Sequence, residues 1–271
     1  MESSLSGQIG KKHTNTSMNT TLIHGDCVEE MTKMQEESID LTVTSPPYDN
    51  LRTYEGSLQW NEGIWKQVLE GLYRVTKKGG VVVWVVGDAT IKGSETGTSF
   101  KQALYAMEVG FNLHDTMIYN RCAPPLTHKR YEQEFEYMFV LSKGKLSSFN
   151  GIQRERKYQD TRKSRKFRRE ADGEYDIGSS KQSKMVLSGN VWKVFAAGGA
   201  GDNFSSLHPA PFPEQLAHDH IISWSNEGDT VFDPFLGSGT TGKMAKQLNR
   251  SFIGIEKVED YYNIAKARIN L

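Results

Sequence analysis

The sequence predicts an α/β protein built on a doubly wound, mostly parallel sheet that carries one basic insert. Short β-rich runs alternate with helical patterns along most of the 271 residues, which favours an open α/β sheet. The run VVVWVVGD at residues 81–88 is apolar, which is typical of a central strand buried on both faces. Between residues 146 and 190 apolar residues become sparse. With 37% hydrophobic residues the chain can bury one full core, with or without an inserted subdomain.

The first half of the predicted domain spans residues 21–145. Its second strand is stopped by two prolines, and one apolar face predicts the helix at 64–75. The KKGG sequence that follows is expected to cap this helix with glycine. The predicted elements are a strand at 21–26, a helix at 28–34, a strand at 38–45, a helix at 64–75, a strand at 81–88, a helix at 100–109 and strands at 115–120 and 136–143.

The second half of the domain spans residues 191–271, after the insert at 146–190. It resumes the α/β alternation and contains a glycine-rich turn between a strand and a helix. The predicted elements are a helix at 213–224, a strand and turn at 229–241, a helix at 241–248, a strand at 251–256 and a last helix from Asp260.

Charge, cysteine content and hydropathy exclude several classes of protein. The formal net charge is zero, so an anionic partner must be met by a local basic patch. Cys27 and Cys122 lack the spacing of a disulfide framework or a zinc site and are expected to be packed thiols, with no metal bound. The polar tail at 1–20 has no apolar centre, and no apolar run approaches a membrane span. We therefore expect a soluble cytoplasmic protein.

The turn DPFLGSGTT, residues 233–241, is expected to be a cradle for a nucleotide-type ligand. It follows a strand and opens a helix, and its glycines let the backbone approach a ligand. A branched side chain at Gly239 is expected to enter that ligand space. The turn lacks the lysine of a phosphate loop, which excludes ATP chemistry. About twenty residues on, Glu256 ends a strand where a carboxylate can accept from both ribose hydroxyls. The alternative is a simple turn and an exposed strand end.

The sequence SPPY, residues 45–48, is the predicted catalytic loop. Pro46 and Pro47 restrict the backbone and remove N–H donors, which leaves acceptors. The Ser45 hydroxyl and the Pro46 carbonyl could accept both hydrogens of an exocyclic base amine, which would favour a pyramidal, nucleophilic nitrogen. Tyr48 could stack on a base swung out of the duplex. The alternative is an ordinary turn after an edge strand.

TSPPY and DPFLGSGTT together resemble the amino-directed DNA methyltransferases of bacterial restriction–modification systems and phages. The resemblance extends from Thr21 to the end of the chain. The catalytic loop comes first, the variable segment second and the glycine loop last, an order similar to the beta group. It implies a circularly permuted, Rossmann-like class I methyltransferase fold and S-adenosyl-L-methionine as cofactor. No Pro-Cys pair is present, so the covalent mechanism of C5-cytosine enzymes is excluded.

The resemblance also implies roles for single residues. Asp26 takes the place of the acid that contacts the cofactor adenine, Glu256 that of the ribose-binding acid, and Asp233 lies near the methionine moiety. His208 stands where the family more often has Lys, which leaves its role open. The full predicted cofactor set is Asp26, Asp233, Phe235, Gly237, Ser238, Gly239, Thr240 and Glu256.

The insert is the predicted contact with double-stranded DNA. Between Arg154 and Arg169 nine cations stand against two acids, with Tyr158 and Phe167 among them, a composition suited to phosphates. The predicted DNA-binding residues are Arg154, Arg156, Lys157, Arg162, Lys163, Arg165, Lys166, Arg168 and Arg169. In the methyltransferase family that the sequence resembles, the target recognition region occupies this position. The alternative is a solvated loop without a partner.

The first residue of the catalytic loop bears on the target base. Ser45 stands where adenine enzymes of the family more commonly have Asp or Asn, which favours cytosine N4. N6-adenine methylation is the alternative enzymatic reading, and an idle DNA-binding or cofactor-sensing module is the alternative from another class. Asp49 could take the amine proton, although a turn cap is favoured. A separate restriction endonuclease and a homodimer both stay open.

Overall fold

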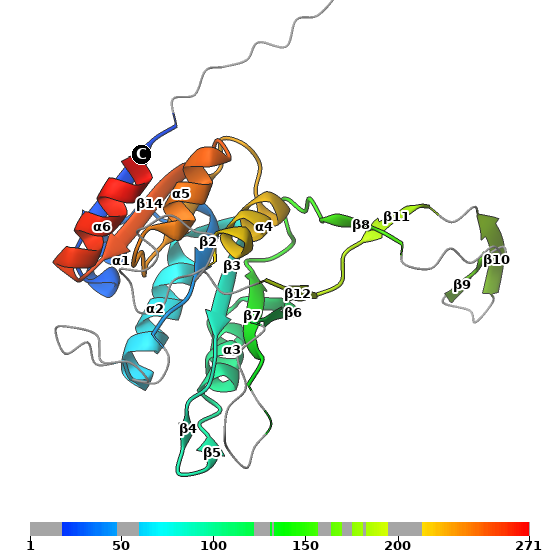
Figure 1. The fold of residues 1–271 in the computed structure, drawn as a ribbon, viewed down its shortest axis with the longest axis horizontal. Helices are drawn as coiled ribbons and strands as arrows, with labels where there is room; N and C mark the ends of the chain where they lie inside the picture. The colour runs from blue at the N-terminus through cyan, green and yellow to red at the C-terminus, as the bar shows by residue number, and fades with distance from the viewer. Residues whose placement is uncertain are drawn as a thin grey trace, which may run out of the picture.

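The computed structural model describes residues 18–47, 60–121, 131, 133–156, 164–169, 175–180, 183–194 and 213–270. Its body is an eight-stranded sheet with helices on both faces (Figure 1). Across the sheet the strands are β1 (Thr20–His24), β14 (Ser251–Glu256), β13 (Thr230–Asp233), β2 (Ile39–Thr44), β3 (Thr76–Val86), β7 (Phe135–Ser142), β6 (Asn112–Asn120) and β12 (Val191–Lys193). Only β7 runs antiparallel to its neighbours in this sheet, so the predicted mostly parallel sheet is confirmed.

Strand β3 explains the apolar run at its centre. Successive side chains of a strand point to opposite faces, and both faces of β3 are buried. Val81, Val83 and Val85 join the core on one side, whereas Val82 and Trp84 join the core on the other. A strand with helices on both sides has no solvated face, so the alternation of apolar and polar residues disappears.

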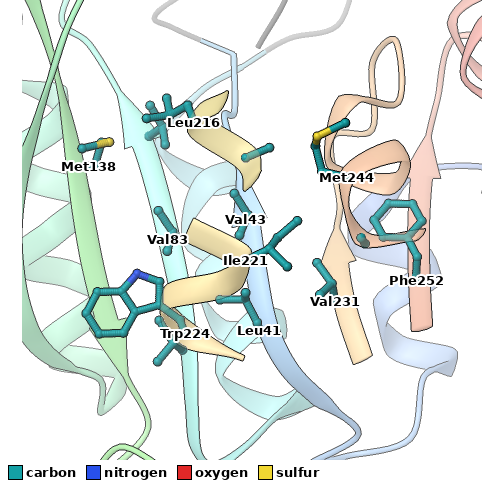
Figure 2. Close-up of a cluster of buried hydrophobic side chains, with 14 of the residues drawn as sticks. Leu41, Val43, Val83, Met138, Leu216, Ile221, Trp224, Val231, Met244 and Phe252 are labelled. Atoms are coloured by element: carbon teal, nitrogen blue, oxygen red, sulfur yellow. The ribbon is translucent and has the colours of Figure 1, made fainter. Parts of the chain in front are cut away.

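In the described part of the chain, three helices cover each face of the sheet. The helices on one face are α1 (Cys27–Lys33), α2 (Glu62–Val75) and α3 (Thr98–Val109), and those on the other are α4 (Glu214–Trp224), α5 (Thr240–Gln247) and α6 (Glu259–Asn270). Figure 2 shows Leu216, Ile221 and Trp224 of α4 lying over Val43 and Val83 of the central strands. Packing on both faces makes the fold doubly wound, as the sequence predicts.

The predicted glycine cap of the helix at 64–75 is wrong. Helix α2 ends at Val75, as predicted, but its C-cap is Thr76 and not a glycine, because β3 begins there and Thr76 already pairs with Ile39. Gly80 instead lies beside a shift in the β2–β3 register, where an added Cβ would come within 2.9 Å of the Asp40 carbonyl oxygen. The glycines of KKGG therefore belong to an irregular strand. The last helix begins at Glu259, one residue earlier than predicted.

The segment between β7 and β12 forms two antiparallel ribbons. Strand β8 (Gln153–Glu155) pairs with β11 (Met185–Leu187), and β9 (Ser164–Arg169) pairs with β10 (Tyr175–Ser180). Both ribbons extend away from the sheet (Figure 1). A further short pair, β4 (Thr90–Ile91) and β5 (Ser94–Glu95), follows β3. The segment boundaries predicted at residues 20, 145 and 190 stay predictions.

Two titratable side chains packed in the core, His220 and Cys27, stay uncharged near neutral pH. His220 is buried, accepts a hydrogen bond from Trp224 Nε1 at 3.2 Å, and burial lowers its pKa to about 3. Burial likewise raises the pKa of the Cys27 thiol to about 12, as expected of a packed cysteine; Cys122 lies outside the described residues. Within the described ranges no helix is both long and apolar enough to cross a membrane.

Candidate active site

Four neighbouring parallel strands end at one edge of the sheet, and each is followed or closed by a predicted site residue. The strand order is β1, β14, β13 and β2, with His24 paired to Glu256 and Asp233 to Gly254. Parallel strands present their carboxyl ends at the same edge, which is where doubly wound proteins bind ligands. The order across this edge is therefore Asp26, Glu256, Asp233, Ser45.

Asp26 sits at the N-terminus of α1. Its Oδ1 accepts from the backbone N–H of Val28 at 2.9 Å and of Glu29 at 3.4 Å, so it caps the helix. Its Oδ2 accepts from Lys257 Nζ at 3.0 Å. Burial alone would raise the pKa of Asp26, but the hydrogen bonds from Lys257 and Val28 hold it below the ordinary value. The acid is thus fixed and ionised beside the end of β14.

Glu256, at the end of β14, forms a hydrogen bond with the glycine loop. Only 9% of this residue is exposed; Oε2 accepts from the Gly237 N–H at 2.8 Å and Oε1 from the Val258 N–H at 2.9 Å. Burial raises the pKa of Glu256, and the two backbone donors oppose that rise. Each carboxylate oxygen can accept a second hydrogen bond. The residue can therefore hold the loop and still accept from a hydroxyl of a ligand.

Asp233 links the two predicted motifs. Its Oδ1 accepts from the Thr44 hydroxyl at 2.6 Å and from the Phe235 N–H at 3.0 Å. Only 5% of the residue is exposed, and burial raises its pKa to about 6 in spite of these donors. Thr241 adds a second link, because its hydroxyl donates to the Val43 carbonyl at 3.2 Å. The catalytic loop and the glycine loop thus begin from strand ends that are bonded to each other.

Three residues of the predicted catalytic loop lie at the end of β2. Pro46 is buried, and Ser45 and Pro47 are half-buried. Since β2 pairs with β13, the two loops leave neighbouring strands. Tyr48 lies outside the described residues, as do Asp49 and His208, so their roles stay predictions.

The glycine loop turns through two left-handed residues, Gly237 with φ 49° and Gly239 with φ 84°. Gly239 also precedes α5 as its N-cap. A Cβ at Gly239 would lie 3.0 Å from Ala265 Cβ and 3.1 Å from Ile269 Cδ1. The expectation that a side chain here would enter the ligand space is wrong, because it would strike α6. Gly239 allows the loop and α6 to pack closely.

Residues 39–267 match the family model described as DNA methylase. The chain belongs to the DNA methylase family. It is 52% identical over 240 residues to the orphan methyltransferase M.BamHII of Bacillus amyloliquefaciens, covering 86% of this chain and 89% of that protein. It is 29% identical over 260 residues to the DNA adenine methyltransferase YhdJ of Escherichia coli K12, covering 93% and 83%.

Solved structures of methyltransferases share the fold of this methylase. The cytosine-N4-specific PvuII DNA methyltransferase has a TM-score of 0.71 at 20% identity, with 93% of this chain and 87% of that chain covered. The M1.HpyAVI–SAM complex has a TM-score of 0.61 at 23% identity, with 93% and 100% covered. These likenesses confirm the predicted methyltransferase-type sheet.

A buried cation behind the glycine loop of the methylase was missed by the sequence analysis. Arg268 of α6 donates to the hydroxyls of Ser238, at 3.1 Å, and Thr240, at 2.8 Å. It also donates to Glu214 Oε1 at 2.8 Å, and Lys243 bonds the same oxygen at 2.7 Å. The hydroxyls of Ser238 and Thr240 thus bond to α6, and their predicted roles in cofactor binding stay predictions. An Arg in an exposed-looking helical pattern gave no sign of this network.

An aromatic cluster surrounds Phe235 of the methylase. The ring of Phe235 lies edge-on to Trp60, with centroids 5.4 Å apart, and to Trp84, at 6.3 Å. Trp84 is buried and donates through Nε1 to Gln102 Oε1 at 2.8 Å, and Trp65 is a buried residue of α2, so both are packing residues. Trp60 was missed by the sequence analysis, because a single tryptophan before a helix carries no pattern.

The predicted DNA-binding cations divide between described and undescribed parts of the insert. Arg154 lies in β8 and is exposed, and Arg156 follows it and is half-buried. The backbone of β9 carries Arg165, Lys166, Arg168 and Arg169. Lys157, Arg162 and Lys163 lie outside the described residues.

Proposed function

We propose that this methylase transfers a methyl group from S-adenosyl-L-methionine to the exocyclic amine of a base swung out of double-stranded DNA, with cytosine N4 as the target. The family match makes the chain an amino-directed DNA methyltransferase. The cofactor, the residue roles and the choice of base are the proposal.

The observation that carries the proposal is the order of residues along the sheet edge. Asp26, Glu256, Asp233 and Ser45 close four adjacent strands. Neighbouring strands are about 4.8 Å apart, so the row spans about 14 Å. An elongated ligand with an adenine, a ribose and an amino-acid end needs an acceptor at each part, and the three acids provide one each. The residues present therefore fit S-adenosyl-L-methionine, with Asp26 towards adenine, Glu256 towards ribose and Asp233 towards the methionine end.

When bound, this cofactor supplies a methyl group activated by a sulfonium leaving group. Residues of the chain activate the base amine that accepts this methyl group. The Ser45 hydroxyl and the Pro46 carbonyl accept the amine hydrogens, which raises the nucleophilicity of a nitrogen whose lone pair is otherwise delocalised. The bond between Thr44 and Asp233 fixes Ser45 relative to the glycine loop, and such positioning supplies much of the acceleration. Tyr48 is proposed to stack on the extruded base.

Cytosine is favoured over adenine by the first residue of the loop. Ser45 offers a neutral hydroxyl, whereas a carboxylate would accept more strongly from an amine. The fold likeness to a methyltransferase named cytosine-N4-specific agrees with this choice. The second candidate is N6 of adenine, which the relationship to a protein named DNA adenine methyltransferase favours.

The test uses a cofactor with a deuterated methyl group and unmethylated bacterial DNA. After incubation with the purified full chain, the DNA is digested to nucleosides and analysed by mass spectrometry. We expect deuterated N4-methylcytosine. Deuterated N6-methyladenine alone would overturn the choice of base, and the absence of any labelled nucleoside would overturn the catalytic proposal in favour of an idle DNA-binding module.

A further inference from the structure

The ribbon formed by β8 and β11 leaves the body of the protein at two fixed points. At one, the Asn150 side chain donates to the carbonyls of Ile222, at 3.2 Å, and Ser225, at 3.0 Å, at the end of α4. At the other, the Asn190 side chain donates to Asp115 Oδ1 and to the Thr116 carbonyl, both at 3.3 Å. Each asparagine also forms a backbone hydrogen bond to the body. The ribbon is therefore held at both roots.

The register of this ribbon separates its side chains by charge. Arg154 pairs with Val186, and the hydrogen bond from Arg156 N to Lys184 O continues the same register. Directly opposed residues share a face, and faces alternate along each strand. Arg154, Arg156 and Lys184 therefore lie on one face, which we call the basic face. The other face carries Gln153, Glu155, Met185 and Leu187.

The other face is turned towards the body at its root. An added Cβ at Gly151 would collide with Leu187 and with Phe149, so these side chains lie over that glycine. The Phe149 ring in turn packs on Trp224 of α4, with centroids 5.1 Å apart. The basic face lies on the opposite side of the ribbon from Leu187 and the Phe149 ring.

The basic face has no partner of opposite charge within the described part of the chain. Arg154 and Lys184 are exposed, and Arg156 Nε donates to the Ser183 carbonyl at 3.2 Å. None of the three cations forms an ion pair with a described residue. Lys33 and Lys66, by contrast, pair with carboxylates on their own helices. Three cations without carboxylates on one side of a fixed ribbon are suited to a polyanion.

We propose that the basic face binds the phosphates of duplex DNA and that the Asn150 clamp sets the direction of that face. The proposal rests on the proposed function and deepens it, because it adds Lys184 and assigns the contact to one side of the insert. A two-stranded β-ribbon has the width that a DNA groove admits. Phosphate contacts position a protein on DNA and dominate the salt dependence of its affinity.

The experiment measures binding of a labelled, mixed-sequence duplex by fluorescence anisotropy over a range of KCl concentrations. The variant carries Arg154→Ser, Arg156→Ser and Lys184→Ser. The matched control carries Lys33→Ser, Lys66→Ser and Lys266→Ser, with the same change in net charge. Each lost phosphate contact lowers the log-affinity against log-salt slope by about 0.9, so the variant should lose about 2 to 3 slope units. The control should retain the slope of the unchanged protein.

Equal slopes in the variant and the unchanged protein would overturn the proposal. So would an equal loss of slope in the control, because net charge alone would then be responsible. Asn150→Ala keeps all three cations, and we expect it to weaken DNA binding by about tenfold while the affinity for S-adenosyl-L-methionine stays unchanged. Affinity for DNA equal to that of the unchanged protein would overturn the role of the clamp.

The measurements distinguish a failure of the proposed methyl transfer from a failure of the proposed basic face. Calorimetry with S-adenosyl-L-methionine should give the same affinity in the triple variant, since the ribbon lies apart from the sheet edge. If the triple variant loses the expected slope but the unchanged protein transfers no methyl group, the proposed function fails and the basic face stands. If it methylates DNA and the triple variant retains the full slope, the basic face fails alone.

Discussion

At the scale of single residues, the site depends on how buried oxygen atoms are satisfied. Asp233 and Glu256 are both nearly inaccessible to water, and each accepts backbone N–H groups from the loop that it supports. Ser45 stands at the end of the row that is nearest to β3 and is half-buried. In the proposed site the three acids face the cofactor, and Ser45 faces the base.

Ser45→Ala is expected to lower kcat by about 100-fold, the cost typical of removing one transition-state hydrogen bond in a catalytic site. The substitution removes one of two acceptors for the amine hydrogens and touches no group assigned to the cofactor. Methyl-transfer kinetics and calorimetry measure the two effects separately. Ser45→Thr, which keeps a hydroxyl, is the control and should retain more activity. An unchanged kcat in Ser45→Ala would remove this residue from the mechanism.

Asp233 makes stability depend on pH. Its pKa is raised from 3.8 to about 6, chiefly by burial, so the folded state binds the proton more tightly than the unfolded chain. Protonated Asp233 therefore adds about 3 kcal/mol to the free energy of unfolding. This contribution is fully present below about pH 4 and is lost as pH rises through about 6. Asp233→Asn stays neutral and keeps an acceptor oxygen. The free energy of unfolding of Asp233→Asn, measured in urea and compared with that of the unchanged protein, should rise between about pH 4.5 and 7. Parallel plots of this free energy against pH for the two proteins would contradict the prediction.

At the scale of elements, a partly buried charge network joins the three helices on one face. Glu214 of α4 accepts from Lys243 of α5 and from Arg268 of α6, and Arg268 also holds the glycine loop. The two partners differ in environment, because the side chain of Arg268 is 1% exposed and that of Glu214 is 31% exposed. One carboxylate therefore joins the three helices, and Arg268 connects it to the glycine loop.

Glu214→Ala is expected to cost more stability than Arg268→Met. Removing the carboxylate leaves a buried guanidinium without a counter-charge, which typically costs about 3–5 kcal/mol. Removing the arginine leaves a carboxylate that still meets Lys243 and water, so a cost of about 1–2 kcal/mol is expected. Urea unfolding of both variants, with Lys243→Met as a further comparison, measures the difference. The reverse order would show that Arg268 acts mainly through the glycine loop.

At the scale of the whole molecule, the ligand row at the sheet edge should couple cofactor binding to global stability. A ligand at one hundred times its Kd adds about 2.7 kcal/mol to the free energy of unfolding. For a domain of this size, that raises Tm by about 5–10 °C. We expect this shift with S-adenosylhomocysteine in the unchanged protein and in Ser45→Ala. Glu256→Ala should lose most of it. A full shift in Glu256→Ala, measured by scanning calorimetry, would remove this acid from the cofactor site.

Much of this architecture could be predicted because it is encoded locally. The uninterrupted apolar run of β3 predicts a strand covered on both faces, and the strand–glycine turn–helix pattern around Gly237 predicts a ligand loop at a strand end. The two prolines after Ser45 end β2 within one residue of the predicted place. Each of these features depends on neighbours within one element, so a single sequence is sufficient to show it.

The tertiary structure decided how those pieces meet. Thr44 and Asp233 are separated by 189 residues, and Glu214 and Arg268 by 54, so no local spacing reveals either bond. Gly239 faces α6 rather than the ligand space, because the path of the chain after β14 brings that helix against the loop. The sequence by itself determined the elements and the chemistry at their ends. Only the folded sheet, whose strand order differs from the chain order, determined which of those ends lie side by side.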